Sequence, residues 1–191
     1  MNAPLTTGAP DPATRLLIGQ KEIIEGIVSG RDLAGLLTSI CRLVETQSDN
    51  MLCSILLLDG ARKHLLLGAA PSLPEAYNLG VHNLPVGDGV GSCGTAAFRN
   101  ERVVVSDIRT HPYWTSCPGI LSLAEKAGLV SCWSEPVRSS KGELLGTFAV
   151  YRKHAGVPDE SDISLIQQAS NLASIAIERK HAEDMIWRQA N

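Results

Sequence analysis

The sequence predicts an α+β fold with a central, mainly antiparallel sheet. Apolar residues recur at helical spacing near both ends of the 191-residue chain, and short apolar runs separated by turn residues fill its middle. These runs follow one another through hairpins and loops, without the regular helical crossovers that parallel strands need. The length and the 44% hydrophobic content suit one globular domain with extensions and exclude global disorder.

The N-terminal part of the chain predicts two helices after an irregular start. Residues 1–15 carry three prolines among small polar residues, and we expect them to form a disordered N-terminus. Apolar residues at helical spacing over Leu16–Val28 predict a helix, so residues 16–30 are assigned to an N-terminal helix. A second amphipathic stripe predicts another helix from Leu33 to near Gln47.

The middle of the chain begins with a hairpin. Met51–Leu58 is apolar on both alternating faces, as expected of a central strand. After the turn at Asp59-Gly60, Leu65–Ala69 can pair back with it. A long connection follows over Pro71–Gly89, with one turn of helix at Pro74–Tyr77.

Helices and strands then alternate as far as the last strand. The expected elements are a helix over Gly91–Phe98, a strand over Val103–Val105, an irregular segment over Ser106–Pro118, a helix over Gly119–Ala127, and strands over Val130–Val137 and Leu144–Tyr151. Because the last two strands flank the turn sequence Ser139-Ser140-Lys141-Gly142, we expect them to form a hairpin.

The final predicted helix runs from Pro158 to about Gln189 and is longer than the domain. Roughly 30 residues at 1.5 Å each reach ~45 Å, whereas a compact core of ~150 residues is only ~38 Å across. Apolar residues surround most of this helix, and a seam at three- and four-residue spacing contains Leu172, Ile175, Arg179, Ala182 and Ile186. This pattern favours a parallel homodimer joined through the N- and C-terminal helices. The alternative is a helix buried by the chain's own N-terminal helices.

Composition excludes several classes of partner. The chain has 17 Lys+Arg against 20 Asp+Glu, a net charge of -3 and only 4% aromatic residues, so no basic or stacking surface for nucleic acid is expected. No apolar run approaches the ~20 residues that span a bilayer, and the N-terminus lacks the features of a signal peptide. We therefore expect a cytoplasmic chain without direct membrane contact.

The histidines and cysteines form no recognisable metal or disulfide motif. The five histidines are scattered, and the five cysteines form no CxxC pair, which predicts free thiols and no metal site. No GxSxG elbow or pair of carboxylates points to hydrolysis. The sequence therefore suggests a regulatory domain without catalytic residues, and it names no cofactor.

Six segments carry a family resemblance. In chain order they are MLCSILLLD, GAAPSLPEAYN, LPVGDGVGSCGTAAFRNERVVVSDI, HPYW, LVSCWSEPVRSSKGELLGTFAVY and LASIAIERKHAE. Over about Leu33–Glu183 the series resembles a bacterial GAF domain of the sensor type, the N-terminal module of GGDEF, PAS or histidine-kinase signalling proteins. The resemblance implies a GAF domain over residues 31–177, with helices on one face of the sheet as a dimer platform and a small-molecule pocket on the other. The tail AEDMIWRQAN resembles the linker that precedes a GGDEF diguanylate cyclase, so residues 178–191 are assigned to a C-terminal signalling helix leading to an output domain in cis.

The resemblance also suggests which residues surround the ligand. The candidates are Cys93, Gly94, Thr95, Asp107, Tyr113, Trp114, Cys132, Trp133 and Ser134. Asp107 can instead cap the loop after it, and Trp133 can instead be ordinary core. The loop VGDGVGSCG matches neither a P-loop nor a dinucleotide motif, which favours a tight turn over a phosphate site. The cyclic-nucleotide signature of the family is absent.

An enzyme function is the alternative hypothesis to a sensor function. Cys93, Asp107, Pro112 and Cys117 resemble positions of the free methionine-(R)-sulfoxide reductases, another GAF branch. Their chemistry needs a thiolate nucleophile and a resolving thiol, but this chain lacks their cysteine before the PVG segment and has Pro118 in place of an acidic residue. A redox sensor that uses Cys93 and Cys117 is a related alternative. A third is a dimerisation module without a pocket, which predicts a filled core behind Trp133.

Overall fold

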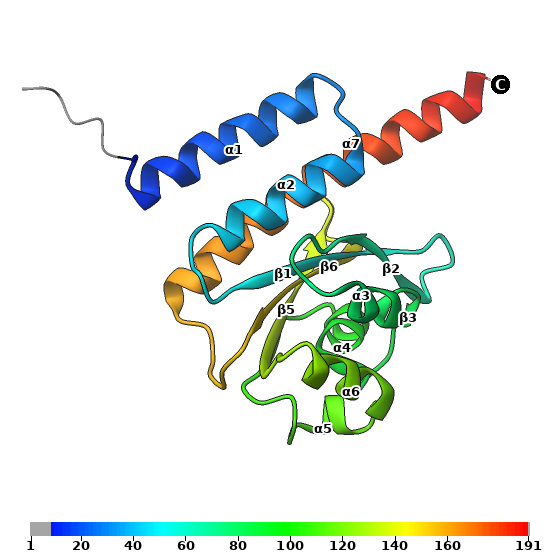
Figure 1. Ribbon diagram of the computed structural model, residues 1–191. Coiled ribbons are helices and arrows are strands. Elements are labelled where there is room, and N and C mark those ends of the chain that lie inside the picture. The colour runs from blue at the N-terminus through cyan, green and yellow to red at the C-terminus, as the bar shows by residue number, and fades with distance from the viewer. Residues whose placement is uncertain (1–8, 191) are drawn as a thin grey trace, which may run out of the picture.

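The computed structural model describes residues 9–190 and shows a six-stranded sheet with helices on both faces (Figure 1). The strands are β1 (Leu52–Leu58), β2 (His64–Ala69), β3 (Leu84–Pro85), β4 (Val103–Val105), β5 (Ser131–Arg138) and β6 (Leu144–Arg152). They lie in the order β3-β2-β1-β6-β5-β4, and every neighbouring pair is antiparallel. The predicted α+β class and antiparallel sheet are confirmed.

Three long helices cover one face of the sheet. They are α1 (Pro12–Val28), α2 (Leu33–Glu45) and α7 (Glu160–Ala190). Helices α2 and α7 pack on the strands, and α1 packs alongside both of them (Figure 1). Their apolar stripes and the facing strand residues, such as Ile55, Trp133 and Phe148, form one core.

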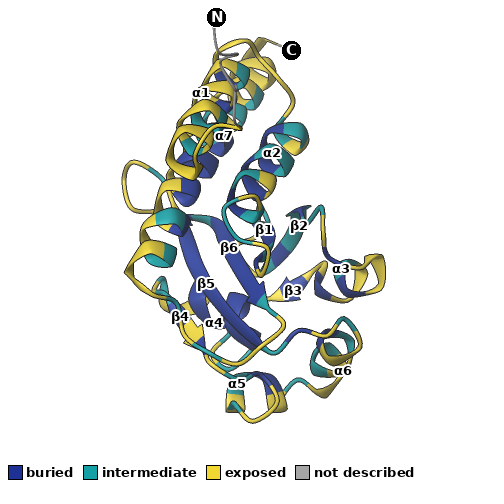
Figure 2. Ribbon diagram, turned by 60° about the vertical axis from the view of Figure 1, so that its left-hand side comes forward, coloured by how far each residue is buried: buried dark blue, intermediate teal, exposed yellow. Residues whose placement is uncertain are grey.

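Four short helices cover the other face. They are α3 (Glu75–Val81), α4 (Gly91–Arg99), α5 (Pro112–Thr115) and α6 (Pro118–Lys126). Helix α4 packs directly on β5 and β6, and α3 packs on α6. A second core lies beneath them, so the central strands are buried on both faces (Figure 2).

The first helix begins earlier than the sequence pattern indicates. Residues 12–15, which were expected to belong to a disordered N-terminus, form the first turn of α1. The carboxylate of Asp11 accepts the backbone N–H of Thr14 at 3.1 Å, and a proline suits the first helical position because it needs no hydrogen-bond partner there. Residues 1–8 lie outside the described part of the chain.

Helix α7 is held to its own domain as far as Arg179. Ser174 donates to the carbonyl of Arg138, and Glu178 accepts the backbone N–H and the hydroxyl of Ser140. The Arg179 guanidinium donates to the carbonyls of Ile27 and Arg31, the latter at 3.0 Å. Beyond this point most of the helix is exposed, which agrees with the projection predicted from its length (Figure 2).

Two positions of the predicted dimer seam face inward instead. Leu172 is buried in the chain's own core, and Arg179 binds the turn between α1 and α2. Ile175 and Ile186, in contrast, are exposed by 51% and 67%. Because α1 and α2 already cover the inner side of α7, only the outward-facing seam positions remain available to contact a second copy. None of the described helices is long and apolar enough to cross a bilayer.

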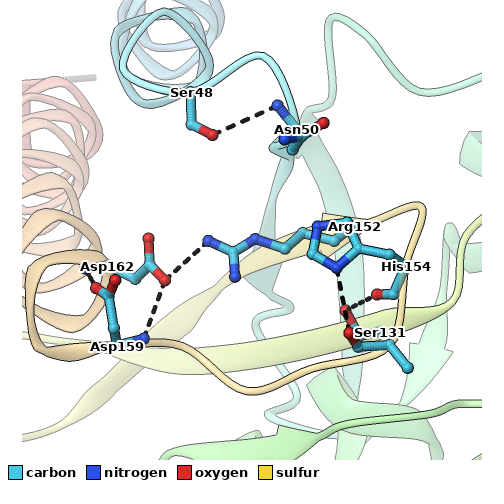
Figure 3. Close-up of polar contacts among 8 residues, drawn as sticks. Ser48, Asn50, Ser131, Arg152, His154, Asp159 and Asp162 are labelled. Carbon is cyan, nitrogen blue, oxygen red and sulfur yellow. Dashed lines mark hydrogen bonds and ion pairs between the residues drawn. The ribbon is translucent and has the colours of Figure 1, made fainter.

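An ion pair joins the sheet to the start of α7. Arg152, the last residue of β6, donates from Nη2 to Oδ2 of Asp162 at 2.8 Å (Figure 3). The same carboxylate accepts the backbone N–H of Asp159, while the Asp159 carboxylate accepts that of Asp162. The first turn of α7 is thereby attached to the strand that ends at Arg152.

Candidate functional site

A small cavity lies between the sheet and the short helices. Its volume is about 10 Å³, and its lining residues are Leu56, Tyr77, Val81, Leu84, Gly91, Ser92, Cys93, Trp114, Ile120 and Tyr151. They come from β1, β3 and β6 below and from α3 to α6 above. A volume of this size corresponds to about one water-sized probe, so the site is nearly filled by the protein's own side chains.

Hydrogen bonds hold the rings around this cavity in place. The indole Nε1 of Trp114 donates to Oγ of Ser92 at 2.9 Å, which connects α5 to α4. The Tyr151 hydroxyl lies 3.3 Å from Oγ of Ser54, within hydrogen-bond distance. The rings of Tyr77 and Tyr151 meet edge to face, with their centroids 5.6 Å apart. The aromatic walls are therefore fixed by contacts between separate elements.

The titratable groups of the cavity are uncharged at neutral pH. Burial raises the pKa of the Cys93 thiol, although a hydrogen bond with Ser134, at 3.1 Å from Sγ to Oγ, opposes the effect. Burial likewise raises the pKa of Cys132 and, well above the ordinary value, those of Tyr77 and Tyr151. The site offers neutral donors and acceptors but no charge.

Four of the predicted site residues lie at the cavity or beside it. Cys93 and Trp114 line the cavity, Ser134 contacts Cys93, and Cys132 belongs to the same core. Thr95 lies in the same helix as Cys93. Its hydroxyl binds the start of that helix and the loop before it, because it accepts the N–H of Gly89 and donates to the carbonyl of Gly91.

Gly94 has a packing role on α4. A Cβ at this position would lie 2.7 Å from the carbonyl oxygen of Pro85, a distance that real Cβ atoms essentially never show. The absence of a side chain lets α4 approach β3 closely. This tight approach accounts for the glycine by packing.

Trp133 is a correction to the predicted site. It belongs to the core beneath α2 and α7, on the face opposite the cavity, and its ring lies under the Arg152 guanidinium at 4.7 Å. Successive residues of a strand point to opposite faces, so the neighbours Cys132 and Ser134 cannot share a face with Trp133. Core packing, the alternative for this residue, is what the structure shows.

Asp107 and Tyr113 lie outside the cavity lining. The Asp107 carboxylate accepts the backbone N–H of Arg109 and pairs with its guanidinium at 2.6 Å, so it caps the loop after β4. The Tyr113 ring contacts that of His111, and the Arg99 guanidinium lies 5.3 Å from its centroid. Both residues organise the surface beside the cavity.

The two cysteines proposed for redox chemistry occupy different surroundings. Cys93 is buried against Ser134, whereas Cys117 is partly exposed before α6, with its sulfur 3.7 Å from the carbonyl oxygen of Gly89. All five cysteines are free thiols in the structure. Among the described residues, no cluster of three or more histidine, cysteine or acidic side chains could hold a metal ion.

Sequence reasoning missed the two tyrosines and Ser92. Tyr77 lies in a segment read as a connection, and Tyr151 lies in a strand whose two faces are both apolar. The only available signal was the alternation of β6, which separates Phe148 and Val150 from Ala149 and Tyr151. Alternation alone cannot tell which of the two sets faces a cavity.

The fold and site define a helix-flanked antiparallel sheet with a cavity under short helices. The family model of the GAF domain matches residues 30–178, and the chain belongs to this family. The predicted resemblance to a sensor-type GAF domain is confirmed.

Three relatives illustrate the similarity. The chain is 36% identical over 179 residues to the methyl sulfide methyltransferase-associated sensor of Methanosarcina acetivorans, covering 94% of this chain and 18% of that protein. It thus spans less than a fifth of that relative's length. The GAF domain of a phosphoenolpyruvate-protein phosphotransferase from Coxiella burnetii superposes with a TM-score of 0.71 at 19% identity, covering 92% and 99% of the two chains. The free methionine-R-sulfoxide reductase from Neisseria meningitidis, solved with its substrate, has a TM-score of 0.67 at 20% identity, covering 96% and 99%.

Proposed function

We propose that this chain is a sensory GAF domain that binds a small molecule in the cavity and passes the signal through α7 to an output domain in cis. One observation carries the proposal. Tyr151 lines the cavity from one face of β6, and the next residue, Arg152, binds Asp162 on α7 from the other. A displacement of Tyr151 therefore acts on the strand end that holds the output helix.

Ligand entry requires the short helices to move, because the closed cavity has a volume of only about 10 Å³. Helix α3 packs on α6 where Gly80 faces Leu123 so closely that a Cβ on the glycine would collide with that leucine. A ligand that prefers the open arrangement shifts the population towards it. A few-fold change in output needs a coupling free energy of only about 1 kcal/mol.

The outward helix faces support a homodimer. Leu17, Ile24 and Val28 follow one exposed stripe of α1, while Ile175 and Ile186 follow one of α7. Two parallel copies would bury these stripes in a shared bundle, with the projecting ends of α7 side by side. Such a bundle converts a shift at Asp162 into a change in helix crossing or register.

The output domain follows α7 in this proposal. The tail resembles the linker before a GGDEF diguanylate cyclase, and this resemblance supports that output. The curated relative is named as a sensor and extends far beyond the matched segment, consistent with a sensor module inside a longer protein. We place the chain in the cytoplasm, where such modules act.

A thiol enzyme acting on free methionine-(R)-sulfoxide is the alternative. The partly exposed position of Cys117 favours it. Against it, Cys93 contacts Ser134 and its pKa is raised by burial, so a second reactive thiol is missing. An assay of methionine-(R)-sulfoxide reduction with Cys117→Ser as control decides the matter, since turnover that disappears in the variant would establish the enzyme.

The sensor proposal is tested by cross-linking at Ala182→Cys in a Cys117→Ser background. Ala182 lies seven residues after Ile175 on the exposed face of α7, so two parallel helices should place the new thiols together. Lys180→Cys is the matched control. Lys180 lies two residues before Ala182 and therefore on the opposite side of the helix, so its thiol should cross-link poorly. A monomer at high concentration without an Ala182→Cys cross-link would contradict the model.

Ligand binding is tested on its own. Mass spectrometry of natively purified protein should show a retained small molecule.

A further inference from the structure

The cavity lining contains no charged side chain, although it lies in a chain that is 19% charged. Two pairs of charged residues beside α4 and β4 lie at the surface: Asp88 with Arg99, and Asp107 with Arg109. A charged ligand in the cavity would lose its hydration without gaining an opposite charge. Transfer of an unpaired charge into such surroundings is strongly unfavourable.

The polar groups of the site are suited to a single neutral hydrogen-bonding group. Thr147 is fully buried, and its Oγ1 makes no hydrogen bond of ordinary geometry among the described residues, although the Cys93 thiol, a weak partner, lies beside it. It is the cross-strand neighbour of Leu56, which lines the cavity, and shares a face of β6 with Tyr151. A buried hydroxyl whose one neighbouring partner is a thiol is poorly satisfied, and a ligand group beside it can supply a stronger hydrogen bond.

The remaining walls are apolar or aromatic. Leu56, Val81, Leu84 and Ile120 provide aliphatic surface, and Trp114 with the two tyrosines provides rings. Because the closed cavity has a volume of only about 10 Å³, a ligand reaches these walls only when the short helices move apart, which favours a small molecule.

Building on the proposed sensor function, we infer that the ligand is a small uncharged molecule with an apolar body and one hydrogen-bonding group. The lining residues exclude nucleotides, carboxylic acids and zwitterionic amino acids as the preferred class. Recognition rests on exclusion of charge and on the shape of the aromatic walls.

The test uses three probes that share a ring and differ in charge: benzyl alcohol, benzoate and benzylamine at neutral pH. Binding is followed through the NMR signal of the Trp114 indole N–H, assigned with Trp114→Phe. Benzyl alcohol should shift this signal saturably and bind at least roughly tenfold more tightly than either charged probe.

Two variants of α6 control for cavity size. Ile120→Ala removes a lining side chain and should tighten benzyl alcohol binding severalfold, whereas Leu121→Ala shortens a neighbour outside the lining and should not. Equal or tighter binding of benzoate or benzylamine would overturn the ligand class while leaving a ligand-binding sensor. Binding of no probe to either the original chain or Ile120→Ala would overturn it as well. The proposed sensor function is tested separately. A protein that stays monomeric and forms no Ala182→Cys cross-link would contradict that function.

Discussion

The Arg152 guanidinium pairs with the Asp162 carboxylate at 2.8 Å and thereby joins the last strand to the first turn of α7 (Figure 3). The two side chains are only 14% and 12% exposed, and the guanidinium also covers the Trp133 ring. Both core layers meet here, because Tyr151 points to the cavity while Trp133 packs beneath α2 and α7. The pair therefore connects the end of a strand that lines the candidate site to α7.

Removing this pair should destabilise the domain. Arg152→Ala leaves the Asp162 carboxylate in a poorly hydrated place without its cation, and the free energy of unfolding should fall by about 2–3 kcal/mol. Urea unfolding followed by far-ultraviolet circular dichroism measures this change without relying on Trp133. Arg109→Ala, in an exposed pair with Asp107, is the control and should have a much smaller effect. Equal losses of unfolding free energy in the two variants would contradict a larger contribution from the buried Arg152–Asp162 pair.

Loss of the Arg179 contacts should loosen α1. The side chain holds the carbonyls of Ile27 and Arg31, where α1 turns into α2. In Arg179→Gln, amide hydrogen exchange over residues 26–31 should accelerate roughly tenfold, since hydrogen bonds to a charged group are lost. Lys180→Gln breaks only an exposed pair with Asp184 and should leave this segment protected. Unchanged exchange in Arg179→Gln would mean that α1 is held by its apolar contacts alone.

The Asp107 carboxyl should contribute an acid-dependent part of the stability. Hydrogen bonds from the Arg109 side chain and, to a lesser extent, its backbone N–H lower the carboxyl pKa from 3.8 to about 2. A lowered folded pKa stabilises the fold above the unfolded value, and this contribution disappears as the pH falls from about 4 towards 2. Asp107→Asn should therefore flatten the pH dependence of the unfolding free energy in that window.

The comparison is made by urea unfolding at pH values between about 5 and 2. Asp49→Asn, at an exposed aspartate before β1, serves as the control and should keep the original profile. Identical profiles for Asp107→Asn and the unchanged chain would contradict the assigned role of the Arg109 contacts.

Thiol reactivity should separate Cys117 from the buried cysteines. Treatment of the native protein with N-ethylmaleimide should label Cys117 first, because Cys93 and Cys132 are buried and burial raises their pKa values. Peptide mass spectrometry after short exposures measures the order, and labelling in urea should remove the difference. Rapid labelling of Cys93 in the native protein would instead support a redox sensor that uses Cys93 and Cys117.

The sequence alone determined the kinds of elements and most of their order. Helical spacing over Leu33–Glu45, the apolar runs of the strands and the turn at residues 139–142 are local signals, because each depends on residues close together in the chain. The same signals failed where tertiary contacts stabilise short pieces, as in α5, a helix of four residues whose Trp114 is anchored by Ser92.

Only the tertiary structure decided which side chains share the cavity. Alternation required Trp133 to face away from Cys132 and Ser134, but it could not say which face held the cavity, because helices cover both faces of the sheet. The Tyr77–Tyr151 contact and the Arg179 bond to the α1–α2 turn join residues far apart in the chain. Such pairings depend on how whole elements pack against one another, and no local pattern records that.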